Sequence, residues 1–345
     1  MSRPYPDAMD TLRSIGGVVT EGLGWALLPQ VKIGQFVAEK AAQALGPKSQ
    51  PAPAVQPQPQ AQAPQAPAPA QAGAPVQAAP QPHQLPPGSY DVASITPEQL
   101  DALKHSKDSK DRALAATIQR SKAAYGDLMK NGSQIIANRQ EGNDGQPVLT
   151  ILPPGFDPSK ETRVHTHYHG YNATVADSKD HGAGLTNRIA EIQQRGGTQT
   201  VIVLPECANA QAGKYNTDWS NVKSQTATTD GALQAAGVNN PTYRVVSAHS
   251  GGGDALTYAL ARAKNGSGLQ ADRLELQDCF YGSQGPVAGW AQTPNGQAAH
   301  SVVYLHGTND ASDAGVRRAF GQRYVRQDYG NHDLTNKKMD SYPDN

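Results

Sequence analysis

The residues with the clearest chemical signal lie between Tyr243 and Gly252, where an apolar, strand-like run leads straight into Ala-His-Ser-Gly-Gly and a helix-like segment. This order is typical of a nucleophile elbow, a sharp strand-to-helix turn that presents a serine side chain. The strained turn needs small residues two positions before and after Ser250, and Ala248 and Gly252 meet that need. A following helix would aim its first backbone N–H groups, beginning with that of Gly251, at an anion formed on the substrate. We therefore predict that Ser250 is a nucleophile; the alternative, a phosphate-binding loop, would need a longer glycine spacing and a lysine.

The same region resembles the α/β-hydrolase superfamily, and the resemblance extends over about residues 133–345. The elbow has an alanine, two residues before the serine, where the superfamily usually has a glycine. The run VHTHYHGYN, residues 164–172, is similar to the third strand of the superfamily, which ends in a His-Gly step. The resemblance implies that the backbone N–H of Tyr171, or that of Gly170, pairs with the N–H of Gly251 as an oxyanion hole.

A nucleophilic serine needs a base, and the superfamily places a histidine after the last strand, near the C-terminus. His332 has that position, because it follows the strand-like run Tyr324–Gln327. His300 and His306 compete with it, but both lie around the preceding strand. The resemblance therefore implies that His332 is the general base.

Two aspartates compete for the role of the triad acid. Asp278 ends the sixth strand in an Asp-x-x-Tyr-Gly pattern that resembles bacterial hydrolases with a His-Ser-Gly-Gly elbow. Asp310 follows the seventh strand in a Gly-Thr-x-Asp pattern that resembles dienelactone-hydrolase-like esterases. Either carboxylate would orient the imidazole and stabilise its cation. We favour Asp278 and keep Asp310 as the alternative.

Three histidines alternate along the third strand, at positions 165, 167 and 169. Alternate residues of a strand point to one face, so a metal site formed by His165, His167 and His169 is an alternative interpretation. No strand-end carboxylate is evident beside them, and the His169-Gly170 step already has a part in the implied oxyanion loop. We therefore predict neither a metal ion nor a cofactor.

The segments that would position these residues follow an α/β order. A hairpin is predicted first, from Ser133–Gln140 and Pro147–Leu152 around a Gly- and Asn-rich turn. Further strands then alternate with helices; we expect strands at 163–169, 198–204, 243–248, 273–277, 301–305 and 324–327, and helices near 184–194, 229–236, 254–264 and 313–322. The order predicts an α/β-hydrolase fold: a mostly parallel sheet of the eight-stranded type with an antiparallel start and flanking helices. Only about 20 residues separate the sixth and seventh strands, so we expect no large cap domain.

The chain before residue 133 is organised differently. Residues 1–46 carry apolar side chains at roughly helical spacing, interrupted by glycine and proline, and we expect a small helical head that docks on a partner or serves as a targeting segment. Residues 47–88 hold 13 of the 26 prolines, so we expect a disordered Pro/Ala/Gln-rich linker. Residues 89–345 would form the hydrolase domain, with one or two helices over about 96–131 as an N-terminal extension.

Composition limits the classes of partner and compartment. The 30 Lys and Arg residues balance 30 Asp and Glu residues, which argues against a nucleic-acid binder. Cys207 and Cys279 follow strands that are not neighbours in this fold, so we expect two free thiols. Without a recognisable signal peptide or transmembrane helix, we expect a cytoplasmic protein, with export by a non-classical route as the alternative. A protein or a membrane surface remains a possible partner of residues 1–46.

The sequence thus predicts a serine hydrolase that cleaves an ester, or another acyl bond, through a Ser-His-Asp triad and an acyl-enzyme. A site without a large cap suits bulky, lipid or polymeric esters. Tyr215, Trp219, Tyr281 and Trp290 are candidates to line it. Two alternatives stay open: a catalytically idle, hydrolase-like binding module tethered to a docking head, and a hydrolase that the head delivers as an effector or toxin.

Overall fold

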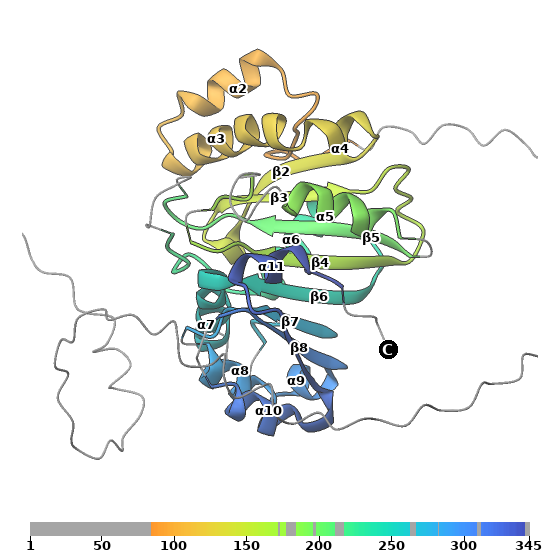
Figure 1. Ribbon diagram of the computed structural model, residues 1–345. Helices are drawn as coiled ribbons and strands as arrows, with labels where there is room; N and C mark the ends of the chain where they lie inside the picture. Colours follow the sequence, from red (N-terminus) through yellow and green to blue (C-terminus); the bar gives the residue numbers. More distant parts are fainter. Residues whose placement is uncertain are drawn as a thin grey trace, which may run out of the picture. The chain divides into compact units, whose positions relative to one another are not determined.

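The computed structural model describes residues 84–171, 173–176, 184–195, 198–210, 217–262, 267–281, 283–308 and 312–341 (Figure 1). These residues all belong to one compact unit of the chain. The predicted head at 1–46 and most of the predicted linker at 47–88 lie outside the described residues. The same holds for Asp310 and Tyr215.

A nine-stranded sheet runs through the centre of the described unit, in the order β1-β2-β3-β5-β4-β6-β7-β8-β9. Its strands are β1 Tyr90–Asp91, β2 Gln134–Gln140, β3 Gln146–Leu152, β4 Thr162–Tyr168, β5 Gln199–Pro205, β6 Pro241–His249, β7 Arg273–Gln277, β8 Ser301–His306 and β9 Tyr324–Asp328. The predicted antiparallel start is confirmed, because β1 to β3 and the pairing of β3 with β5 are antiparallel. All later pairs are parallel. The two-residue edge strand β1 was not predicted, since two residues show no hydrophobic period.

The parallel strands bring distant segments of the chain to one edge of the sheet. The register pairs Tyr168 of β4 with Ala248 of β6, and His249 of β6 with Gln277 of β7. Consequently the residues that follow β4, β6 and β7 leave the sheet side by side at its carboxyl edge. Ligands of open parallel sheets bind at this edge.

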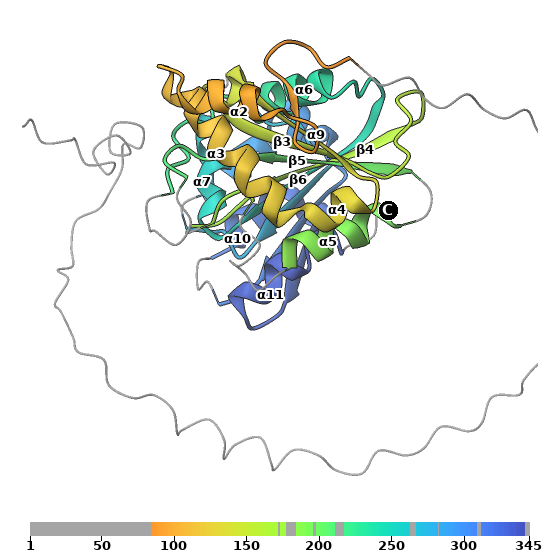
Figure 2. The same ribbon diagram turned by 90° about the horizontal axis from the view of Figure 1, so that it is seen from above.

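Helices cover both faces of the sheet (Figure 2). They are α2 Pro97–Lys104, α3 Ser109–Ala124, α4 Gly126–Lys130, α5 Gly184–Gln193, α6 Gln225–Ala235, α7 Gly253–Arg262, α8 Gln284–Trp290, α9 Pro294–Ala298, α10 Ala314–Phe320 and α11 His332–Lys337. One apolar cluster joins α3 and α5 to one face of the sheet, and Met339, just after α11, belongs to it. The opposite face is covered by α6 over β2 to β5 and by α7, α8 and α10 over β6 to β8.

The N-terminal extension forms three helices, one more than the upper number expected from the sequence. Thr96 caps α2 through a capping box with Gln99, as the Thr-Pro start predicts. The side chain of Asp108 accepts a hydrogen bond from the backbone N–H of Lys110 and caps the start of a second helix, α3. A further break at Tyr125 separates α3 from α4. Because caps interrupt an otherwise continuous helical period, the period alone undercounts the helices.

Two short helices, α8 and α9, occupy the described connection between β7 and β8. Val287 and Trp290 of α8 are buried in the core, so this segment packs on the body instead of rising from it as a cap. Trp219 is buried in the same cluster, so neither tryptophan lines an open site. Cys207 and Cys279 are free and buried, which confirms the prediction of two free thiols. None of the helices in the described ranges combines the length and apolarity needed to span a membrane.

Candidate active site

Ser250 occupies a sharp turn directly after β6. Its φ of 51° lies in the left-handed region, which costs a residue with a side chain about 1–2 kcal/mol. The backbone then enters a short 3₁₀ turn, Ser250–Gly252, that leads into α7. A Cβ atom at Gly252 would lie 2.5 Å from the carbonyl oxygen of Tyr168. The local structure therefore has the features expected of the predicted elbow.

The strand order places this turn within a known architecture. From β2 onward, an antiparallel pair precedes a parallel sheet, β4 and β5 exchange positions in the order, and the strained serine follows β6 in the middle of the sheet. This chain has the α/β-hydrolase fold. The fold expected from the sequence is thus confirmed. The described part of the connection between β7 and β8, where a cap domain could have been inserted, is short.

Similarity to known proteins was found among solved structures, and it is low. No family model matches the chain, and no curated protein matches its sequence. Among solved structures, it is similar to a CE1 ferulic acid esterase from Anaeromyces mucronatus in complex with ferulic acid, with 14% identity over 59% of this chain and 87% of that one and a TM-score of 0.41. The brefeldin A esterase, a bacterial homologue of human hormone sensitive lipase, has 13% identity over 71% of this chain and 88% of that one, with a TM-score of 0.37. The enterochelin esterase from Shigella flexneri has 13% identity over 60% of this chain and 56% of that one, with a TM-score of 0.39.

Asp278 and His332 form a close pair beside the elbow. The Nδ1 atom of His332 lies 2.6 Å from Oδ2 of Asp278. Asp278 is fully buried, follows β7 directly and has a left-handed φ of 45°. Its Oδ2 also accepts the backbone N–H of Thr308 at 2.9 Å, which fixes the carboxylate. A Cβ at Gly307 would meet both residues, at 2.6 Å from Oδ2 of Asp278 and 2.8 Å from Cα of His332.

The competing histidines lie elsewhere. His306, at the end of β8, has its Nδ1 2.7 Å from Oδ1 of Asp328, a residue of β9. The ring of His300 lies 5.9 Å from that of Tyr243, at the opposite, amino-terminal edge of the parallel strands. Of the three candidate bases, the structure brings His332 to Asp278. Asp310, the alternative acid, lies outside the described residues.

The loop after β4 lies against the elbow. A Cβ added at Gly170 would lie 3.0 Å from Cβ of Ser250, and one added at Gly251 would lie 2.7 Å from ring atoms of Tyr171. The Tyr171 hydroxyl donates to Oδ2 of Asp254 at 2.7 Å, which holds the ring over the start of α7. The two predicted oxyanion residues, Gly251 and Tyr171, are therefore neighbours beside the serine.

His249 is a further side chain in this cluster, and the sequence interpretation gave it no role. Its ring lies 4.7 Å from the ring of His332, and its Nε2 is 3.3 Å from the carbonyl oxygen of that residue. His249 is fully buried. The one feature of the sequence that could have indicated a role for His249 is its position directly before Ser250.

Three large apolar or aromatic side chains are exposed among the described residues, and all belong to segments that carry the candidate site. They are Tyr171, Tyr281 and Leu334, which we call the rim. Tyr171 follows β4, Tyr281 follows Asp278 by three positions, and Leu334 follows His332 by two. Partial burial and the Asp278 charge raise the pKa of Tyr281, and a hydrogen bond with Ser250 offsets part of the rise. Ser250 itself is 9% exposed.

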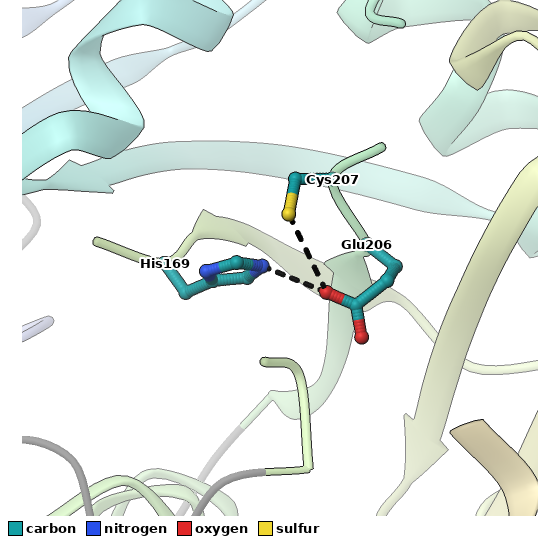
Figure 3. A group of neighbouring side chains, drawn as sticks. All are labelled: His169, Glu206 and Cys207. Atoms are coloured by element: carbon teal, nitrogen blue, oxygen red, sulfur yellow. Dashed lines mark hydrogen bonds and ion pairs between the residues drawn. The ribbon is translucent and has the colours of Figure 1, made fainter. Parts of the chain in front are cut away.

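The three histidines of the third strand do not form one cluster. His165 Nε2 and His167 Nδ1 share the hydroxyl of Ser247, at 2.6 and 2.8 Å. His169 pairs instead with Glu206, which follows β5 (Figure 3). Burial and neighbouring arginine charges, Arg163 first among them, lower the pKa of His165, so that ring is neutral at pH 7.

His169, Glu206 and Cys207 are the described residues whose donor atoms approach a metal-ligand arrangement, all within 4.8 Å of one another. Their contacts fit an ion pair better. His169 Nε2 lies 2.9 Å from Oε1 of Glu206, and its Nδ1 lies 3.0 Å from the carbonyl oxygen of Gly170, so both ring nitrogens already have acceptors. Arg120 Nη2 adds a positive charge 3.4 Å from Glu206. A cation bound here would displace these contacts.

A buried cluster of charges anchors the segment that follows His332. Asp340 is 1% exposed and accepts hydrogen bonds from Arg163 at 2.6 and 3.0 Å, from Arg195 at 2.9 Å and from Arg273. The Glu275 carboxylate accepts its backbone N–H at 2.9 Å. Since the three arginines come from β4, from β7 and from the segment just after α5, this anchor ties the C-terminal segment to the sheet. The sequence does not predict this anchor, because none of these residues is close to Asp340 in the chain.

Proposed function

We propose that this protein is a serine hydrolase that cleaves carboxylic esters through an acyl-enzyme. The observation that carries the proposal is that Asp278 and His332 meet beside the strained turn of Ser250. Ser250 leaves β6 in a strained turn, Asp278 leaves the adjacent β7, and His332 lies 2.6 Å from that aspartate. A nucleophile, a base and an acid that orients the base are the parts of a serine triad.

Each residue would have a distinct part in the reaction. The Ser250 oxygen attacks the ester carbonyl while Nε2 of His332 takes its proton, and the same proton then goes to the departing alcohol. Asp278 stays ionised, holds Nδ1–H of the ring and stabilises the imidazolium. The N–H groups of Gly251 and Tyr171 would bind the oxyanion. Water, deprotonated by His332, then cleaves the acyl-enzyme and releases the acid.

The rim supports a bulky, lipid or polymeric ester as the substrate. Tyr171, Tyr281 and Leu334 are 36%, 57% and 39% exposed, whereas most large apolar side chains of the unit are buried. Exposed apolar groups that gather on segments of one site commonly mark a binding surface. The helix α8, which follows Tyr281 in the chain, packs on the body through Val287 and Trp290 and leaves Tyr281 exposed.

Labelling with a fluorophosphonate probe tests the proposal, because the probe reacts with activated serines. We expect the wild type to be labelled at neutral pH with or without a chelator, Ser250→Ala to be unlabelled, and Ser159→Ala, a change at an exposed serine, to be labelled like the wild type. Hydrolysis of 4-nitrophenyl esters should follow the same order. A folded wild type that neither labels nor hydrolyses these esters would favour the idle binding module. Labelling of Ser250→Ala would place the nucleophile elsewhere.

A further inference from the structure

We propose that Glu206 and His169 form a buried ion pair that positions the oxyanion loop, the segment after β4 that carries Gly170 and Tyr171. The pair does so by fixing the direction of the Tyr171 N–H. The inference deepens the proposed function, on which it rests, because it assigns positioning roles to two residues outside the triad. It starts from the contacts of the His169 ring and of the carboxylate of Glu206.

The His169 ring controls a single peptide plane. Its Nδ1 lies 3.0 Å from the carbonyl oxygen of Gly170. That carbonyl belongs to the same peptide unit as the N–H of Tyr171, and none of the described peptide bonds is cis. In a trans peptide the C=O and N–H bonds point in opposite directions. A ring that holds the Gly170 oxygen on one side therefore turns the Tyr171 N–H to the other side.

The elbow lies directly against the residues of this peptide. Gly170 is packed so closely on Ser250 that an added Cβ would lie 3.0 Å from the serine Cβ, and the ring of Tyr171 covers Gly251. Among the hydrogen bonds between described residues, none uses the N–H of Tyr171. A donor that is aimed in advance is what oxyanion stabilisation requires, since it costs no reorganisation during the reaction.

Glu206 holds this loop at two points. Its Oε1 lies 2.9 Å from Nε2 of His169, and its Oε2 accepts the backbone N–H of Val175 at 3.3 Å. The register of the sheet explains the first contact. Thr166 of β4 pairs with Val203 of β5, and the same register three residues further on puts His169 beside Glu206.

The backbone of Glu206 is itself held firmly. Asn143 and Asn221 donate to the Glu206 carbonyl oxygen at 2.9 and 3.1 Å, and the Glu206 N–H donates to Pro147 at 2.9 Å. The residue is 2% exposed. A fixed acceptor on a rigid strand end is suited to orient a neighbouring loop.

Two acceptors at one imidazole require both ring nitrogens to carry protons, and only the cation does so. Burial would lower the pKa of His169, but Cys207 and Glu206 outweigh it and raise the pKa to about 10. The other groups that face the pair are Arg120 of α3, 3.4 Å from Oε2 of Glu206, and Trp219, whose ring lies 4.7 Å from the His169 ring. The His169 ring is therefore a cation at neutral pH.

The decisive variant is Glu206→Gln in the full-length protein, with Glu161→Gln, an exposed change, as the matched control. The substitution keeps the shape and removes the charge. We expect kcat on a 4-nitrophenyl ester to fall by about 10- to 100-fold with little change in KM, because a misaimed donor weakens transition-state binding alone. The rate of fluorophosphonate labelling should fall by a similar factor. Restoring the charge in Glu206→Asp should recover part of the loss.

A second measurement does not depend on catalysis. In the wild type at pH 8, ¹⁵N NMR of the His169 ring should show both nitrogens protonated, and in Glu206→Gln one of them should lose its proton. An unchanged kcat in a folded Glu206→Gln, or a loss confined to KM, would overturn the positioning role. A neutral His169 ring in the wild type would do the same, as would one tightly bound zinc per chain that a chelator removes together with activity. If the wild type lacks hydrolase activity, the proposed function fails, and the NMR result still decides whether the ion pair exists.

Discussion

Ser250 and Asp278 leave adjacent parallel strands at the same level of the sheet, and both do so in left-handed backbone. The register pairs His249 with Gln277, and the next residue on each strand has a φ of 51° or 45°. Two neighbouring strained residues with side chains indicate that the surrounding structure imposes these conformations, a pattern common at functional sites.

Relief of this strain gives a stability prediction. The free energy of unfolding of Ser250→Gly should be about 1 kcal/mol higher than that of Ser250→Ala, because glycine adopts a left-handed φ without a Cβ penalty. Both variants should lose activity. Chemical denaturation of the two proteins measures the difference. Equal stability would mean that the turn is not strained in solution.

The acid of the candidate triad is tested by two matched changes. Asp278→Asn should lower kcat/KM by roughly 10³- to 10⁴-fold, because Asp278 holds Nδ1 of His332 at 2.6 Å and the amide favours the wrong tautomer. Asp310→Asn should have a small effect. Steady-state kinetics of both variants measure this. The reverse pattern would assign the role to Asp310.

Gly307 supplies a steric test of the same pair. A Cβ at this position would lie 2.6 Å from the Asp278 carboxylate, so Gly307→Ala should displace Asp278 or His332 and lower kcat/KM by about 10²-fold. Gly315→Ala is the control, because nothing lies within 4 Å of its added Cβ. Comparable kinetics in the two variants would show that the pair tolerates displacement.

The C-terminal anchor predicts a large stability loss. Asp340→Asn should reduce the free energy of unfolding by about 3 kcal/mol, since it leaves Arg163, Arg195 and Arg273 without their shared buried carboxylate. Asp127→Asn, which removes an exposed pair with Lys130, should leave stability nearly unchanged. Denaturation by urea compares the two. A small effect at position 340 would show that the tail is not held by this cluster.

The ion pair of His169 predicts a pH dependence of stability. The pKa of this histidine is raised to about 10 in the folded protein, so the stability that it contributes is complete below its unfolded pKa of about 6.5 and is lost as the pH rises through 10. The difference in melting temperature between the wild type and Glu206→Gln should therefore shrink between about pH 7 and 10.5. A constant difference over this range would show that His169 carries no charge.

The amino-acid sequence by itself determined the elements and the nucleophile candidate. The apolar run before Ser250, the small residues at Ala248 and Gly252 and the alternation of strands and helices are local patterns, and the strands at 273–277 and 134–140 lie where those patterns predict them. The parallel order followed from the same alternation. The capped breaks around α3 and the two-residue strand β1 did not, because they depend on single contacts.

Only the tertiary structure decided which distant side chains meet. Asp278 reaches His332 across 54 positions, and Glu206 reaches His169 across 37. Both meetings follow from the packing of the chain and the register between strands, quantities that no local pattern encodes, because one sequence can pair its strands in several registers. The same reason applies to Asp340, whose three arginine partners come from separate elements. A local pattern marks a turn that can hold a nucleophile, whereas the partners of that nucleophile are fixed by the sheet that carries it.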